Sequence, residues 1–302
     1  MTYSPLASPS ATRAVLAAHG LATKKRLGQH FLIDDNIIGR ILALADLAGD
    51  EVVLEVGPGI GTLTVALCEV ARALVAVERD VSLVPVLAET VAECPRFALV
   101  QADAVTVATD TIDEPFGPPV ALVANLPYGV AATVLLRCFE QMPSLRMATV
   151  MVQAEVADRI SAQVGTKEYG AYTVKLRLRA EPVARFAVSR ACFLPPPRVD
   201  SAVVRLERRE YPADVGAVGA RDRDRPAPSA DVLADAASAA DAAFAQRRKT
   251  IRNSLRAVLS VPSAAIDTAL EVAGIDGSVR AETLEPSTYV TLGAALRAVD
   301  AF

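Results

Sequence analysis

Four consecutive residues, Asn125, Leu126, Pro127 and Tyr128, carry groups that could activate an aromatic amine. The lone pair of such an amine is delocalised into its ring, so a catalyst must localise the lone pair and aim it. The Asn125 side-chain oxygen and the Leu126 carbonyl oxygen are two acceptors for the two amine hydrogens. Pro127 stiffens the turn, and Tyr128 offers a ring face on which a base taken out of its helix can stack. The segment predicts a site for methylating an adenine amine.

A second aromatic face is predicted at Phe193, which opens the stretch FLPPPRVDS. The three prolines that follow hold an extended backbone and would present Phe193 from a stiff loop. Phe193 and Tyr128 are then expected to sandwich the target adenine. The alternative is a proline-rich surface connection with a buried phenylalanine.

Gly57, Gly59 and Gly61 form the pattern E-x-G-x-G-x-G directly after an apolar run. Glycine at these positions lets the backbone turn tightly and approach a ligand closely. The pattern resembles the S-adenosylmethionine loop of class I methyltransferases. Glu78, at the end of the next apolar run, could accept both ribose hydroxyls of that cofactor, and Asp103 could accept its adenine amine. A sulfonium cofactor supplies its own electrophile, so no metal is expected.

Short apolar runs alternate with helical patterns through the first half of the chain. Turn or polar residues bound each run, and this rhythm is typical of a doubly wound, mostly parallel sheet. Later apolar runs could add antiparallel strands. Strands are expected at 52–56, 73–78, 97–101, 120–124 and 148–153, added strands at 174–179, 184–188 and 202–207, and helices at 36–48, 62–70 and 81–92.

The length of 302 residues favours about two domains. The expected fold is α/β, a Rossmann-like class I methyltransferase sheet with helices on both faces, plus a small all-helical C-terminal domain. We expect a loose N-terminal extension at 1–20, a catalytic domain at 21–209, a flexible linker at 210–230 and a helical domain at 231–302.

Charge is distributed unevenly along the chain, whose formal net charge is −4. Residues 175–256 hold 17 basic and 10 acidic side chains. This basic block could bind phosphate although the whole chain is acidic, because salt screens the electrostatic field of more distant charges. The four cysteines are dispersed and lie far from both histidines, which predicts no zinc site, no disulfide and a reducing cytoplasm. No apolar run suits a membrane span or an export signal.

Together these segments resemble the ribosomal RNA adenine dimethyltransferase family of the KsgA type. The stretches KKRLGQHFLID, LEVGPGIGTLT, VAVERD, QADA, NLPY, FLPPPRVDSAVVRL and FAQRRKTIRNSL follow one another in family order over roughly residues 22–300. The resemblance implies dimethylation of two adjacent adenines in the terminal hairpin loop of small-subunit rRNA, late in subunit assembly. The implied cofactor is S-adenosylmethionine, and the implied partner is the small ribosomal subunit.

The resemblance also assigns residues to roles. His30, Leu32, Gly57, Glu78, Asp103 and Asn125 are the implied cofactor contacts, although many relatives have asparagine where this chain has His30. The basic stretch that opens the helical domain resembles an rRNA backbone contact. The expected RNA-binding residues are Lys24, Lys25, Arg26, Arg198, Arg247, Arg248, Lys249 and Arg252.

Three other functions remain open from the sequence. The related macrolide-resistance methyltransferases act on large-subunit rRNA and share the glycine loop and the Asn-x-Pro-Tyr segment. An assembly factor whose binding matters more than its catalysis is a second alternative. A small-molecule methyltransferase is disfavoured by the basic block and the appended helical domain. Nothing in the sequence requires more than a monomer.

Overall fold

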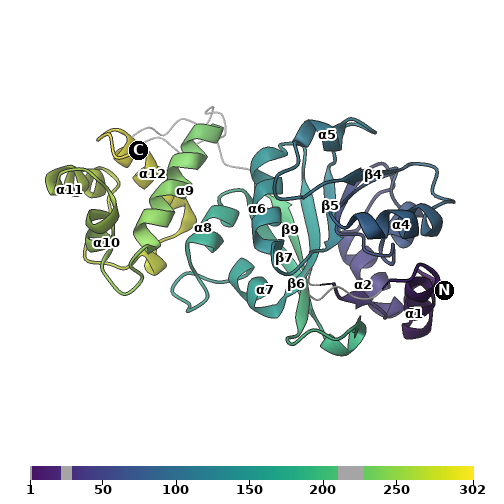
Figure 1. The fold of residues 1–302 in the computed structure, drawn as a ribbon. Coiled ribbons are helices and arrows are strands. Elements are labelled where there is room, and N and C mark those ends of the chain that lie inside the picture. The colour runs from purple at the N-terminus through teal and green to yellow at the C-terminus, as the bar shows by residue number, and fades with distance from the viewer. Residues whose placement is uncertain (1, 22–28, 210–227) are drawn as a thin grey trace. The chain divides into compact units, whose positions relative to one another are not determined.

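The computed structural model describes residues 2–21, 29–209 and 228–302. It divides the chain into two compact units. The first contains Met1–Ala157 and Pro182–Arg208, and the second contains Asp158–Glu181 and Arg209–Phe302. The segment 158–181, which we expected in the catalytic domain, belongs with the C-terminal helices. Figure 1 shows strands and helices in the first unit and helices in the second.

The first unit is built around a seven-stranded sheet with the order β4-β3-β2-β5-β6-β9-β7. Strands β4, β3, β2, β5 and β6 run parallel, and β9 pairs antiparallel with β6. The sequence prediction of these strands is confirmed to within one residue at each boundary of the parallel set. The strands are β2 (Val52–Val56), β3 (Ala73–Glu78), β4 (Phe97–Gln101), β5 (Ala121–Asn125), β6 (Met147–Gln153), β7 (Ala180–Val188) and β9 (Ser201–Arg208).

Helices of the first unit bury their apolar faces on this sheet. Ile37, Ile38 and Ile41 recur at helical spacing and pack in one cluster with Val53 and Val123 of the strands. A short antiparallel pair, β1 (Phe31–Leu32) with β8 (Phe193–Leu194), lies outside the main sheet. The helices are α1 (Pro9–Ala18), α2 (Asp35–Ala45), α3 (Thr64–Cys68), α4 (Val84–Thr90), α5 (Thr109–Asp113), α6 (Ala131–Gln141) and α7 (Ala154–Ile160).

The expectation of a loose extension at residues 1–20 is wrong. Ser8 caps α1 by accepting a hydrogen bond from the Ala11 N–H. The backbone N–H groups of Tyr3 and Ser4 donate to the Asp35 carboxylate. Leu16 packs in one apolar cluster with Phe31 and Leu83, so α1 is anchored to the first unit (Figure 1). Composition misled here because alanine, serine and proline also suit a capped helix.

The second unit is a bundle of helices around its own apolar core. Gly293 of α12 lets two helices approach closely, since a Cβ there would lie 2.6 Å from the Ala236 backbone nitrogen of α9. The strand expected at 174–179 is wrong, because Val174 and Leu178, four residues apart, are both buried in this core. The helices are α8 (Ala171–Arg177), α9 (Ala230–Phe244), α10 (Ile251–Val258), α11 (Ser263–Val272) and α12 (Pro286–Arg297).

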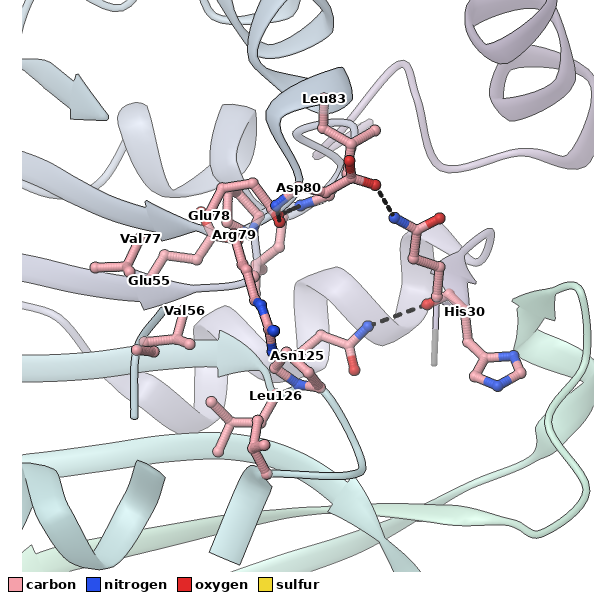
Figure 2. Close-up of a pocket in the computed structure, with 18 of the residues that line it drawn as sticks. His30, Glu55, Val56, Val77, Glu78, Arg79, Asp80, Leu83, Asn125 and Leu126 are labelled. Carbon is pink, nitrogen blue, oxygen red and sulfur yellow. Dashed lines mark hydrogen bonds between the residues drawn. The ribbon is translucent and has the colours of Figure 1, made fainter. Parts of the chain in front are cut away.

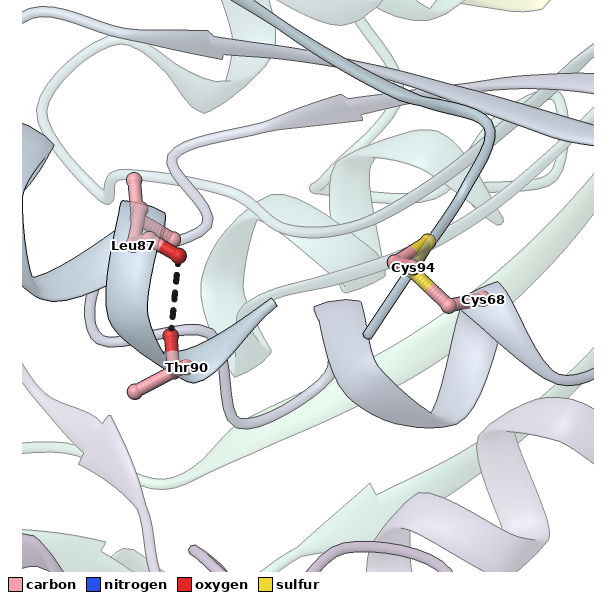
Figure 3. The surroundings of a disulfide bond; sticks show 4 residues. All are labelled: Cys68, Leu87, Thr90 and Cys94. Atoms are coloured by element: carbon pink, nitrogen blue, oxygen red, sulfur yellow. Dashed lines mark hydrogen bonds between the residues drawn. A yellow bond between two sulfur atoms is a disulfide. The ribbon is translucent and has the colours of Figure 1, made fainter. Parts of the chain in front are cut away.

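Cys68 and Cys94 form a disulfide with a Cα–Cα distance of 5.8 Å (Figure 3). This corrects the expectation that the cysteines stay unpaired. Cys68 ends α3, which leads into β3, and Cys94 precedes β4. Because β3 and β4 are parallel neighbours, both connections return the chain to the same edge of the sheet. Sequence spacing alone did not reveal that proximity.

Candidate active site

A cavity of about 400 Å³ opens at the carboxyl ends of the parallel strands. It lies where the order of the sheet changes direction, between β2 and β5, which is the usual ligand site of such folds. Figure 2 shows Glu78 and Asp80 on one side of it and Asn125 with Leu126 on another. The structure therefore brings the predicted strand-end residues together.

The glycine loop that follows β2 forms one wall of this cavity. Gly57 and Gly61 have φ angles of +73° and +90°, a region that residues with a Cβ rarely occupy. A Cβ on Gly57 would lie 3.0 Å from Pro127 Cγ, and one on Gly61 would lie 2.7 Å from Thr90 Oγ1. The positive φ angles and these close contacts favour glycine at both positions, and Gly57 lines the cavity whereas Gly61 does not.

Glu78 and Asp103 supply the two predicted carboxylates of the cavity. The Asp80 N–H donates to Glu78 Oε1 at 2.7 Å, and the Gly59 N–H donates to Oε2 at 3.4 Å. Burial raises the pKa of Glu78 and these backbone donors oppose the rise. Asp103 accepts from the Val105 N–H at 2.9 Å and lies 3.2 Å from an Arg79 nitrogen. Backbone bonds thus hold both carboxylates in place.

Asn125 ends β5 with its amide group oriented by the backbone. Its Nδ2 donates to the His30 carbonyl oxygen at 3.4 Å, while the buried Oδ1 has no hydrogen-bond partner among the described residues (Figure 2). No donor in the described part of the chain reaches the Leu126 carbonyl oxygen either. A buried acceptor without a donor costs about 1–3 kcal/mol, so this arrangement suits a ligand that brings two hydrogens.

Tyr128 is fixed at both its hydroxyl and its ring. The hydroxyl forms a 2.6 Å hydrogen bond with Ser201 Oγ, and burial raises the pKa of Tyr128. The His30 imidazole stacks on the ring, with centroids 5.5 Å apart, and its Nδ1 lies 2.8 Å from the Pro195 carbonyl oxygen. The ring that faces Tyr128 is therefore His30.

Phe193, the second aromatic face predicted from the sequence, does not line the cavity. Phe193 is 2% exposed and packs in the apolar cluster of α2 and the sheet. This burial fits the alternative weighed from the sequence, a proline-rich connection with a buried phenylalanine, and base stacking by Phe193 stays a prediction. Leu32 is also buried in that cluster, yet it lines the cavity, as the implied cofactor contact requires.

Glu55 is a site residue to which the sequence analysis gave no role. It opens the E-x-G-x-G-x-G pattern, which was the available signal. Its side chain lines the cavity, is almost fully buried, and leaves Oε2 without a partner in the described structure. Burial raises the pKa of Glu55 to about 8, and the neighbouring Glu78 charge adds to this effect. A cationic ligand group would satisfy it.

The expected RNA-binding residues fall into three groups. Lys24, Lys25 and Arg26 lie outside the described residues. Arg198 is exposed on the first unit. In the second unit, Arg247 pairs with Glu282 at 3.2 Å and Arg252 pairs with Asp267 at 3.0 Å, whereas Arg248 and Lys249 are exposed. Two of the four basic side chains there are thus already engaged by carboxylates.

No group of three or more metal-ligating side chains occurs in residues 2–21, 29–209 and 228–302. Within those ranges, every helix is too short or too polar to cross a bilayer.

Comparison with known proteins gives matches over nearly the whole chain. A family model described as "Ribosomal RNA adenine dimethylase" matches residues 20–219. "Ribosomal RNA small subunit methyltransferase A" of Rhodococcus opacus is 44% identical over 294 residues, 96% of this chain and 94% of the relative. The protein of that name from Streptomyces avermitilis is 42% identical over 292 residues, 95% of this chain and 92% of the relative.

Two solved structures resemble the fold. A dimethyladenosine transferase from Plasmodium falciparum superimposes with a TM-score of 0.71 at 21% identity, covering 90% of this chain and 99% of that one. The 23S rRNA methyltransferase ErmE gives a TM-score of 0.62 at 29% identity, covering 88% of this chain and 99% of that one.

Proposed function

The chain belongs to the ribosomal RNA adenine dimethylase family, and from this premise we propose that it dimethylates the N6 amines of adenines in small-subunit rRNA. It is an S-adenosylmethionine-dependent enzyme. The observation that carries the proposal is the Asn125 Oδ1 atom, a buried acceptor without a donor at the end of β5. It stands beside the Leu126 carbonyl in a cavity of suitable size.

The residues of the cavity fit this cofactor. Glu55 and Glu78 offer carboxylates for an ammonium group and for ribose hydroxyls, and the glycine loop leaves backbone exposed between them. Asp103 offers an acceptor to an adenine amine, in place of its contact with Arg79. S-adenosylmethionine supplies an electrophilic methyl group when bound. The cofactor-binding residues proposed are therefore the cavity-lining His30, Leu32, Glu55, Gly57, Gly59, Glu78, Asp103 and Asn125, together with Gly61, which shapes the loop without lining the cavity.

The chain's own residues position the target amine. Asn125 Oδ1 and the Leu126 carbonyl oxygen accept its two hydrogens, which favours a pyramidal nitrogen with its lone pair directed into the cavity. Tyr128 is the proposed stacking face for the adenine ring, and Ser201 fixes its orientation. Positioning and exclusion of water then supply the rate enhancement.

The finer substrate is two adjacent adenines in the 3'-terminal hairpin loop of 16S rRNA, methylated during small-subunit biogenesis. The names of the relatives at 42–44% identity support the small subunit. The likeness to ErmE keeps large-subunit rRNA as the second candidate. We further propose that the protein acts as a monomer, without a metal, in the cytoplasm where ribosomal particles assemble.

Methyl transfer to undermethylated small subunits tests the function. Labelled S-adenosylmethionine is supplied with small subunits and, in parallel, with large-subunit RNA, and the modified bases are mapped. Dimethyladenosine at two neighbouring loop positions of the small subunit is the expected result. Transfer to large-subunit RNA alone would overturn the substrate and leave the reaction standing.

A further inference from the structure

His30 immediately precedes β1 and lies opposite the proline-rich stretch that follows β8. In this antiparallel pair, Phe31 is opposite Leu194. The same register, continued by one residue, places His30 opposite Pro195. Both residues of β1 are buried in apolar clusters of the first unit, so the pair is anchored. The backbone of His30 is therefore held in place beside the cavity that it lines.

The backbone and the side chain of His30 contact two residues of the proposed catalytic segment. Its carbonyl oxygen accepts from Asn125 Nδ2 at 3.4 Å (Figure 2). Its imidazole stacks on the Tyr128 ring, with centroids 5.5 Å apart and an angle of 25° between the two planes. Its Nδ1 lies 2.8 Å from the Pro195 carbonyl oxygen, and because a carbonyl only accepts, Nδ1 carries the hydrogen of this bond. The Pro195 carbonyl thus orients the imidazole.

The hydrogen bond to Ser201 fixes the direction of the Tyr128 side chain but not the plane of its ring. The hydroxyl oxygen lies on the axis of the χ2 torsion, so the ring can turn about that axis without breaking the 2.6 Å bond to Ser201 Oγ. The χ2 torsion of tyrosine is broad and imposes little restraint. The His30 imidazole lies across one face of the ring, and a turn of the ring would bring its edge against the imidazole. His30 therefore sets the plane that Ser201 leaves open.

The plane of the Tyr128 ring determines where a stacked adenine places its amine. A base stacks nearly parallel to the aromatic ring that supports it. The proposed acceptors of the amine hydrogens, on Asn125 and Leu126, belong to the same segment as Tyr128. A tilted ring would carry the amine away from them, and a displacement of about 1 Å at a reacting centre slows catalysis strongly. Since the imidazole covers one face of Tyr128, the opposite face is left for the base.

We propose that His30 is a positioning residue for the target base, because its imidazole sets the plane of the Tyr128 ring on which the adenine stacks. The inference rests on the proposed function for the identity of the base. It gives the His30 side chain a task toward the substrate, in addition to the cofactor contact proposed above. His30 acts through Tyr128 and takes part in no bond that is made or broken.

The first test compares His30→Leu with His30→Phe. Leucine has no flat face, whereas phenylalanine keeps a ring that can stack and loses the hydrogen bond to Pro195. Single-turnover transfer to undermethylated small subunits at saturating S-adenosylmethionine should fall about tenfold in His30→Leu and stay within about threefold of wild type in His30→Phe. The Kd for S-adenosylmethionine should change less than about twofold in His30→Phe. A rate as low in His30→Phe as in His30→Leu would contradict a stacking role.

Phe186→Leu is the matched control for the loss of an aromatic contact in the first unit. The Arg40 guanidinium lies 3.9 Å from the centroid of the Phe186 ring, and Phe186 does not line the cavity. This variant should therefore transfer methyl groups at the wild-type rate. Thermal midpoints of all variants identify any that lose the fold.

A double-mutant cycle tests whether His30 acts through Tyr128. Tyr128→Ala removes the ring that the imidazole contacts, so adding His30→Leu to this variant should lower the transfer rate by no more than about twofold. In the wild-type background the same substitution is expected to cost about tenfold. Equal losses in the two backgrounds would show that the imidazole acts on the cofactor or the RNA directly, and would overturn the inference.

A measurement on the ring itself separates this inference from the proposed function. The full-length protein is prepared with isotopically labelled tyrosine, and the NMR signals of Tyr128 are identified by their loss in Tyr128→Phe. Their line shapes report how fast the ring turns, which should be several-fold faster in His30→Leu than in wild type or His30→Phe. Equal rates in wild type and His30→Leu would overturn the inference even if the protein methylates small subunits.

The wild-type protein alone decides the proposed function. If it transferred no methyl group to the RNA of either subunit, the proposed function would be refuted. The rate at which the Tyr128 ring turns would still show whether His30 sets its plane.

Discussion

The cavity of the first unit and the surface of the second unit differ in how particular polar groups are paired. In the cavity of the first unit, Glu55 Oε2 and Asn125 Oδ1 are buried and without described partners. On the second unit, the half-buried Lys175 and the exposed Arg256 are paired with carboxylates. The first arrangement lowers stability and suits a ligand, whereas the second contributes at most a modest stabilisation. For these four side chains, the unpaired groups line the cavity and the paired ones do not.

The strongest way to sharpen this comparison is to remove the buried acceptor. Asn125→Ala deletes one of the two acceptors proposed for the target amine, so methyl transfer should fall by roughly 10²–10³-fold, as it does when a preorganised group at a reacting centre is lost. Single-turnover transfer to small subunits measures this.

Binding of RNA provides the control for that variant. Asn125→Ala should retain wild-type affinity for small subunits, because it leaves the basic residues that are expected to bind RNA unchanged. Activity within tenfold of wild type would refute the amine-positioning role of Asn125.

A second prediction concerns the pH dependence that Glu55 imposes on stability. Its pKa is raised from 4.5 to about 8 in the folded protein, chiefly by burial. Between these values the folded state holds a proton that the unfolded state releases, so stability falls as pH rises through this window and levels off above it. The contribution of this group is at most about 1.4 kcal/mol per pH unit.

Glu55→Gln is the matched variant, since glutamine has nearly the same shape and carries no charge. Urea unfolding at pH 5, 6.5 and 8 should show that the variant loses part of the pH dependence and is more stable than wild type at pH 8. Raised groups that do not interact with Glu55, such as Asp113, contribute equally to both proteins. If the free energy of unfolding fell equally steeply with pH in the two proteins, the raised pKa of Glu55 would be contradicted.

The smallest effect is expected from a paired charge of the second unit. Arg256→Ala breaks an exposed pair with Asp267 and should lower the free energy of unfolding by less than about 1 kcal/mol. Its affinity for small subunits should stay within twofold of wild type. A loss of affinity as large as that of Arg248→Ala, a variant of an exposed basic residue expected to bind RNA, would mean that ion pairing does not distinguish structural charges from RNA-binding ones.

The sequence predicted the parallel strands and the cavity well. Strand-end residues such as Glu78 and Asn125 could be placed because parallel strands end at one edge of the sheet. The helix at Val174 was misread because a short apolar run does not distinguish a strand from a buried helix. The sequence left both an exposed and a buried Phe193 open, because a proline-rich stretch fixes the backbone without fixing which way the ring points.

The hydrogen-bond and ion-pair partners of the side chains could not be predicted from the sequence. The partners of Arg247 come from segments about 35 and 80 residues away, and only the folded unit brings them together. The same holds for the hydrogen bond that orients Asn125, whose acceptor belongs to His30. A sequence motif and the spacing of apolar residues predict where a residue lies along a helix or strand. The contacts between elements that are distant in the sequence depend on how the unit packs.

The Cys68–Cys94 bond has a topological consequence for the cavity. It closes a ring of chain that contains all of β3 and therefore Glu78, the carboxylate proposed for the ribose. A protease that cuts once inside this ring would leave two pieces joined as one molecule on a gel until a reductant is added. While the bond is intact, a cut in α4 would leave β3 joined to the chain at its N-terminal end, and the chain after the cut would stay joined to it through Cys94 and Cys68.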